Sequence, residues 1–136
     1  MPCSRNPYKE EERGFTSVEL VVLVPVLMLA VLLVVEAAMV RHGNQVAKAA
    51  AEDGAAAARA YGGSVAAGEA EARDTLAQLG DGLLDDVTVK VQRDPTRARV
   101  EVTGRVRGVL PGIHPTVRAA TSGMTERFVA EGQRGP

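Results

Sequence analysis

The feature that most constrains this chain is a long run of apolar residues near its N-terminus. Between Phe15 and Val40 the only charged side chains are Glu19 and Glu36, and residues 20–35 are uncharged and almost wholly aliphatic. As an α-helix, the whole run would extend roughly 39 Å and its uncharged part roughly 24 Å, against a bilayer hydrocarbon core of about 30 Å. We therefore predict a single transmembrane helix over residues 15–40, with both glutamates near the membrane surfaces.

A buried core helix is the alternative interpretation of this run. The run is apolar on every face, and a chain of 136 residues has too little other apolar surface to enclose it. Pro25 lies inside the run, where it removes one backbone donor and favours a bend that membrane helices tolerate. Both observations favour the membrane interpretation.

A cleaved secretory signal is a second alternative. Such a signal has a basic N-terminal region, a shorter apolar stretch and a small-residue cleavage site. Cleavage after Ala38 would release a soluble ligand-binding protein. The charge rule gives no orientation, because three Lys or Arg residues precede the run and three follow it closely, namely Arg41, Lys48 and Arg59.

The junction before the apolar run carries a more specific pattern. Gly14 precedes Phe15, and Glu19 lies five positions after the glycine, where membrane insertion disfavours a carboxylate. The order Gly-Phe-x-x-x-Glu ahead of an aliphatic helix resembles a type IV prepilin signal. This resemblance implies cleavage between Gly14 and Phe15 by a prepilin peptidase on the cytoplasmic side. The leader, residues 1–14, would then leave with Cys3.

The position of Glu19 also has a physical interpretation. Cleavage would create an α-amino group on Phe15, which lies one helical turn before Glu19 on the same face. An ammonium group and a carboxylate stabilise each other in a low-dielectric setting, and a carboxylate near a helix N-terminus complements the helix dipole. In pilin-like assemblies the amine comes from the neighbouring subunit, which implies that Glu19 helps to set register. A glutamate that merely reaches the membrane surface is the simpler alternative.

Features beyond the junction narrow the resemblance. Pro25 in mid-span, Glu36 near the distal end and a small-residue helix over residues 44–62 resemble TadE-like pseudopilins of the tight-adherence (Flp) pilus system. Two features depart from that pattern. The leader is not net basic, and Ala37 and Ala38 follow Glu36 where such proteins often have an aromatic residue or glycine.

The resemblance implies a structural pilus-assembly or secretion protein held in the bacterial cytoplasmic membrane by one span, with an extracytoplasmic C-terminal domain. Its implied partners are the membrane, the prepilin peptidase, other pilin or pseudopilin subunits and the pilus assembly platform. The competing hypothesis is an unprocessed single-pass anchor that displays an extracytoplasmic protein-binding domain. Under that hypothesis, Glu19→Ala would change neither localisation nor partner capture.

The sequence after Val40 predicts helices followed by strands. The first helix is expected to extend over residues 41–61, with Gly43 and Gly54 as weak points that cost about 1 kcal/mol each. A break follows at residues 61–64, and apolar spacing predicts a second helix over residues 65–79.

From Val87 onward, apolar and polar residues alternate, and the alternation resumes after a turn at residues 94–97. This pattern predicts a β-hairpin that continues through residues 106–109, and a third strand is expected over residues 116–124. The apolar face of this sheet should pack on one or both helices, and the other face should meet solvent or a partner.

The predicted fold class is therefore α+β. A long N-terminal transmembrane helix extends into a small extracytoplasmic domain, residues 62–130, with a short second helix and an antiparallel sheet of about three strands. A flexible tail is expected over residues 131–136.

Charge is unevenly distributed along the chain. Residues 1–86 have a net charge of −6 and residues 87–136 a net charge of +5. Four arginines fall roughly on the polar face of the predicted sheet, namely Arg97, Arg99, Arg105 and Arg107. A solvated face is the simplest interpretation, and docking to an acidic partner subunit is the alternative. Nucleic-acid binding is not predicted, because no aromatic platform accompanies these residues.

No motif for catalysis or metal binding emerges from the sequence. His42 and His114 are far apart, and neither lies near a cysteine or a carboxylate cluster with metal-ligand spacing. The serines lack the context of an activated nucleophile. We therefore expect no enzymatic activity, no catalytic residues, no cofactor and no metal.

Overall fold

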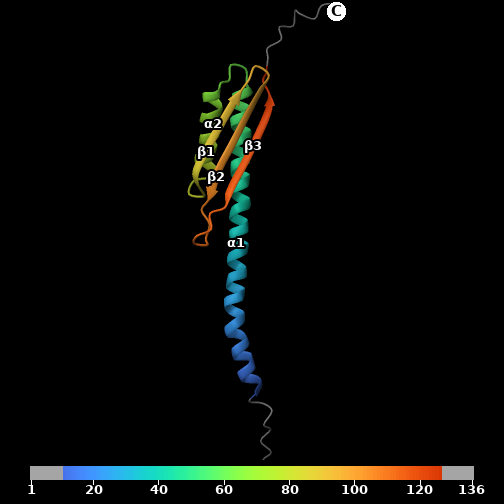
Figure 1. The fold of residues 1–136 in the computed structure, drawn as a ribbon, viewed down its shortest axis with the longest axis vertical. Helices are drawn as coiled ribbons and strands as arrows, with labels where there is room; N and C mark the ends of the chain where they lie inside the picture. The colour runs from blue at the N-terminus through green and yellow to red at the C-terminus, as the bar shows by residue number, and fades with distance from the viewer. Residues whose placement is uncertain (1–10, 127–136) are drawn as a thin grey trace, which may run out of the picture. The chain divides into compact units, whose positions relative to one another are not determined.

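The computed structural model describes the backbone of residues 11–126 and the side chains of residues 17–126. Most of the predicted leader and the whole predicted tail, residues 131–136, lie outside the described residues. Two helices and three strands follow in order: α1 (Glu11–Arg59), α2 (Val65–Leu79), β1 (Leu84–Arg93), β2 (Arg97–Val106) and β3 (Thr116–Met124) (Figure 1). The chain divides between Val35 and Glu36 into an N-terminal unit and a C-terminal unit.

The described part of the N-terminal unit is an apolar helix with no protein packed around it. Its side chains from residue 17 to Val35 are exposed, apart from the half-buried Leu32. The helix continues through Pro25 without interruption. Among the described residues, α1 is the one helix long and apolar enough to cross a membrane, and its most apolar window is wholly unburied. The predicted long apolar helix is confirmed.

The C-terminal unit has a core of small side chains. Alternate residues of β2 point inward and are buried, as the predicted period of two requires, and Val100 and Val102 are fully buried. They pack against the buried face of α1, which includes Val46, Ala50 and Ala51. Figure 1 shows α2 and the C-terminal half of α1 behind the sheet. The helices therefore cover one face of the sheet and leave the other open.

Glycines let the elements of this core approach one another closely. A Cβ atom added to Gly54 would lie 2.8 Å from the Gly68 carbonyl oxygen and 2.9 Å from the Ala72 Cβ. A Cβ atom on Gly43 would lie 2.7 Å from Val106 Cγ2. The interpretation of Gly43 and Gly54 as weak points was therefore incomplete, because both are buried where a side chain would not fit.

The sheet has strand order β1-β2-β3, with both neighbouring pairs antiparallel. The bounds predicted for α2 and β3 are confirmed. The first strand begins at Leu84 rather than Val87, because a bulge between Asp85 and Thr88 interrupts the alternation and places Asp86 at φ 49°. The predicted continuation of β2 through residues 106–109 is wrong, since the strand ends at Val106.

The close crossing of α1 and α2 predicts that Gly54→Val destabilises the C-terminal unit. The added side chain would overlap the backbone of α2, and overpacking of this kind costs about 1–3 kcal/mol. Ala56→Val, on the exposed face of the same helix, is the matched control and should change stability much less. Urea unfolding of the full chain in detergent, followed by circular dichroism, compares the two variants. Equal stability would contradict the packing role of Gly54.

Candidate functional site

Glu36 is the first residue of the C-terminal unit, and it is buried, with 7% of its surface exposed. Its Oε2 atom accepts hydrogen bonds from the backbone N–H groups of Val109, at 2.8 Å, and Leu110, at 3.3 Å. A buried carboxylate is costly unless donors satisfy it, and two backbone donors satisfy one of its oxygens here. Glu36 therefore fixes the segment between β2 and β3, residues 107–115, against α1.

The second carboxylate oxygen of Glu36, Oε1, is buried and has no hydrogen-bond partner among the described residues. Gly108 lies directly against this carboxylate, and a Cβ atom at position 108 would overlap Oε1 and lie 2.7 Å from Oε2. A glycine is therefore required beside the carboxylate, and the loop approaches Glu36 with its backbone. Sequence reasoning placed Glu36 near a membrane surface but did not identify its partners.

The base of the 107–115 loop is held by further bonds. The Arg107 N–H donates to the Leu83 carbonyl, and the Val106 N–H donates to the Pro115 carbonyl, both at 2.8 Å. The Arg107 guanidinium also donates to both oxygens of Asp85, at 3.0 and 2.7 Å. These hydrogen bonds, with the positive charge of Arg107, hold the pKa of Asp85 below its ordinary value.

The tip of the same loop exposes apolar side chains. Val109 and Ile113 are 48% and 49% exposed, and Pro111 between them is exposed as well. The Ile113 N–H donates to the Leu110 carbonyl at 3.4 Å, which closes the turn. The loop thus combines a backbone held at several points with an apolar tip that is about half exposed.

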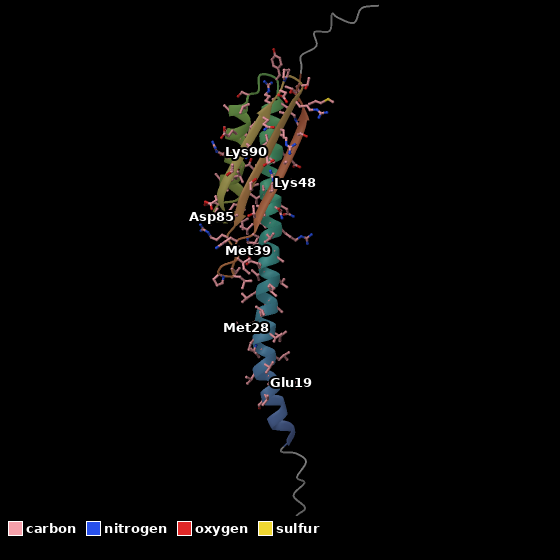
Figure 2. All side chains as sticks on the ribbon, in the orientation of Figure 1. Glu19, Met28, Met39, Lys48, Asp85 and Lys90 are labelled. Atoms are coloured by element: carbon pink, nitrogen blue, oxygen red, sulfur yellow. The ribbon has the colours of Figure 1, made fainter. Side chains whose placement is uncertain are left out.

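The outward face of the sheet carries basic side chains from all three strands. Arg97, Arg99 and Arg105 alternate with buried residues along β2, so they share this face. Lys90 of β1, labelled in Figure 2, lies opposite Glu101 in the register, and Arg118 of β3 lies opposite Thr103. We call these five residues the basic face. The fourth predicted arginine, Arg107, lies beyond the end of β2 and pairs with Asp85.

Carboxylates partly neutralise the basic face. Glu101 accepts a hydrogen bond from Arg118 at 2.6 Å and lies 3.8 Å from Arg99. The Arg118 hydrogen bond lowers the pKa of Glu101, so this pair stabilises the folded chain above the ordinary glutamate pKa and ceases to do so as acid protonates Glu101. Arg105 lies 3.3 Å from Asp86. The five cations still outnumber these two carboxylates, and the face is positively charged.

The residues of the predicted processing site lie in α1. Gly14 and Phe15 fall within the helix, and their side chains are outside those described. Glu19 is exposed on the helix surface, as Figure 2 shows. Pro25 lies further along the same helix. Glu19 is therefore a carboxylate on an otherwise apolar helical surface that the protein leaves uncovered.

In the described part of the chain, an uncovered apolar helix followed by a small α+β unit indicates a single-pass membrane anchor. A family model described as TadE-like protein matches residues 14–56, and this match confirms the predicted resemblance. Over these residues the chain is similar to the TadE-like family. The match includes Gly14, Glu19 and Glu36, whereas α2 and the sheet lie outside it. No curated protein and no solved structure matches the chain.

The contact between Glu36 and the loop predicts faster amide exchange in Glu36→Ala. The N–H groups of Val109 and Leu110 lose their acceptor, and a hydrogen bond to a charged group contributes about 1.5–3 kcal/mol, so exchange should accelerate by roughly tenfold or more. Glu52→Ala, which removes an exposed carboxylate from the same helix, is the control. Hydrogen–deuterium exchange of peptides that span residues 107–115 measures the effect. Unchanged exchange would show that Glu36 does not hold the loop.

Proposed function

We propose that this chain is a membrane-held pseudopilin that a prepilin peptidase cleaves between Gly14 and Phe15. The observation that carries the proposal is the combination of a TadE-like match that begins at Gly14 with an exposed carboxylate, Glu19, on an apolar helix. The processed subunit joins or primes a tight-adherence pilus or a related secretion filament. It lies in the bacterial cytoplasmic membrane with its C-terminal unit outside the cytoplasm.

Glu19 is central to this proposal because of its surroundings. A carboxylate inside a bilayer costs a few kcal/mol, and that cost falls when a cation neutralises it. Cleavage supplies such a cation, since it creates an α-amino group on Phe15. An ion pair between Glu19 and the amine of a neighbouring subunit would stabilise the packed subunits relative to the isolated subunit in lipid. The same ion pair would favour one register between the subunits.

Processing predicts a mature protein that begins at Phe15 in cells with an active prepilin peptidase. N-terminal sequencing of the purified membrane protein measures this directly. Gly14→Val places a branched side chain at the cleavage position, and the variant should retain its leader.

Glu19→Gln should be anchored in the membrane but should enter filaments poorly, because a neutral amide cannot form an ion pair with an ammonium group.

Three outcomes would contradict this proposal. An intact terminus at Met1 or Pro2 beside an active peptidase would rule out processing. Normal filament assembly by Glu19→Gln would rule out the ion-pair role. A terminus near Met39 and a soluble product would indicate signal peptidase instead.

We infer further that the basic face contacts an acidic surface of a partner subunit. The helices cover the opposite face of the sheet, so this face is open, and it carries an excess of positive charge over three adjacent strands. Charge complementarity between subunits speeds their encounter and disfavours wrong partners. Arg97 and Arg99 are exposed and lie two residues apart on the central strand.

This role predicts that Arg99→Glu reduces co-assembly with partner subunits several-fold, because it introduces repulsion at the centre of the basic face. Arg73→Glu makes the same charge change on α2, away from the sheet, and is the control. The fraction of the chain recovered with sheared filaments measures the effect. An equal loss in both variants would indicate a response to net charge, and no loss in Arg99→Glu would indicate a solvated face.

A further inference from the structure

The 107–115 loop exposes an apolar tip although its backbone is firmly held. Single exposed apolar residues are common on protein surfaces. Here Val109, Pro111 and Ile113 are all exposed within five residues, on a loop that hydrogen bonds fix at its base and at its tip. A loop held in this way cannot turn its apolar side chains away from water by local rearrangement, so the tip presents a persistent apolar surface.

Chain connectivity places this tip close to the end of the apolar run. Glu36 is bonded covalently to Val35, the last residue of the uncharged stretch. The Val109 and Leu110 N–H groups lie 2.8 and 3.3 Å from its carboxylate. The loop backbone is therefore bound to the residue that directly follows the uncharged stretch.

The loop backbone is also suited to a low-dielectric boundary. Unpaired N–H groups oppose entry into lipid, because each costs several kcal/mol there. The N–H groups of Val109 and Leu110 are paired with Glu36, and that of Ile113 is paired with the Leu110 carbonyl. Pro111 and Pro115 have no N–H group. Three peptide donors around the apolar tip, those of Val109, Leu110 and Ile113, are therefore satisfied within the protein.

An arginine and two histidines lie near Glu36 or within the loop along the chain. Arg41 and His42 are exposed and begin the second turn of α1 after Glu36, and His114 is exposed within the loop itself. Basic and aromatic side chains with polar ends are favourable at the headgroup level of a bilayer, where they meet anionic phosphates. The surroundings of the tip thus match the chemistry of a phospholipid surface.

We propose that the tip of the 107–115 loop is a second membrane contact, in which Val109, Pro111 and Ile113 enter the boundary between phospholipid headgroups and acyl chains. Glu36 is the positioning residue, since its carboxylate holds the tip beside the end of the span. The inference rests on the proposed membrane placement of the apolar run. It adds a surface of the C-terminal unit that binds lipid and limits the motion of that unit above the bilayer.

Depth-dependent tryptophan quenching tests this proposal, because the chain contains no tryptophan of its own. Three single variants of the full chain, Ile113→Trp, Leu29→Trp and Met124→Trp, are reconstituted into phosphatidylcholine–phosphatidylglycerol vesicles that contain brominated acyl chains. Leu29 lies in the apolar run, and Met124 is a 77% exposed residue at the far end of β3. Ile113→Trp should be quenched and blue-shifted, Leu29→Trp should be quenched, and Met124→Trp should be unaffected.

The outcomes separate the two proposals. An unquenched Ile113→Trp beside a quenched Leu29→Trp overturns the loop contact and leaves the membrane anchor intact. An unquenched Leu29→Trp contradicts the anchor itself. A blue-shifted but unquenched Ile113→Trp would mean that protein covers the tip, which also overturns the proposal. Adding Glu36→Ala to Ile113→Trp should reduce quenching, whereas adding Glu52→Ala should not.

Discussion

The helices and the sheet of the C-terminal unit pack together only because their backbones approach closely. The chain has two phenylalanines, two tyrosines and no tryptophan, so it cannot fill a thick core with aromatic rings. Its largest fully buried side chains are valines. Helices and strands can approach closely only where small residues lie between them. Gly43, Gly54 and Gly68 are such residues. Alanine and glycine in α1 therefore allow close packing, and alanine also favours the helix.

The burial of α1 changes at Glu36. On its N-terminal side the helix surface is apolar all round and uncovered, and on its C-terminal side one face of the helix is buried in the core. The carboxylate at this point binds a loop 73 and 74 residues away along the chain. A carboxylate is costly in lipid and in a dry core. Backbone N–H groups of the loop offset part of that cost by hydrogen bonds to one oxygen of Glu36.

The fold was predictable where local signals agreed. The bounds of α2 follow from Ser64, whose hydroxyl accepts a hydrogen bond from the Ala67 N–H, and from Gly80 after the last turn. The period of two identified the hairpin of β1 and β2. The start of β1 was missed because the bulge at Asp86 interrupts that period. The packing of Gly54 and the partners of Glu36 were not predictable, since both depend on contacts between residues far apart in the sequence.

The strand order has a consequence for how the C-terminal unit reaches its folded state. Each strand pairs with its neighbour in sequence, so the sheet can form by successive short-range closures, which cost little chain entropy and proceed quickly. The contact between Glu36 and Val109 closes a much longer segment of chain. We expect the sheet to form early in folding. The contact between the 107–115 loop and Glu36 of α1 should form later and more slowly.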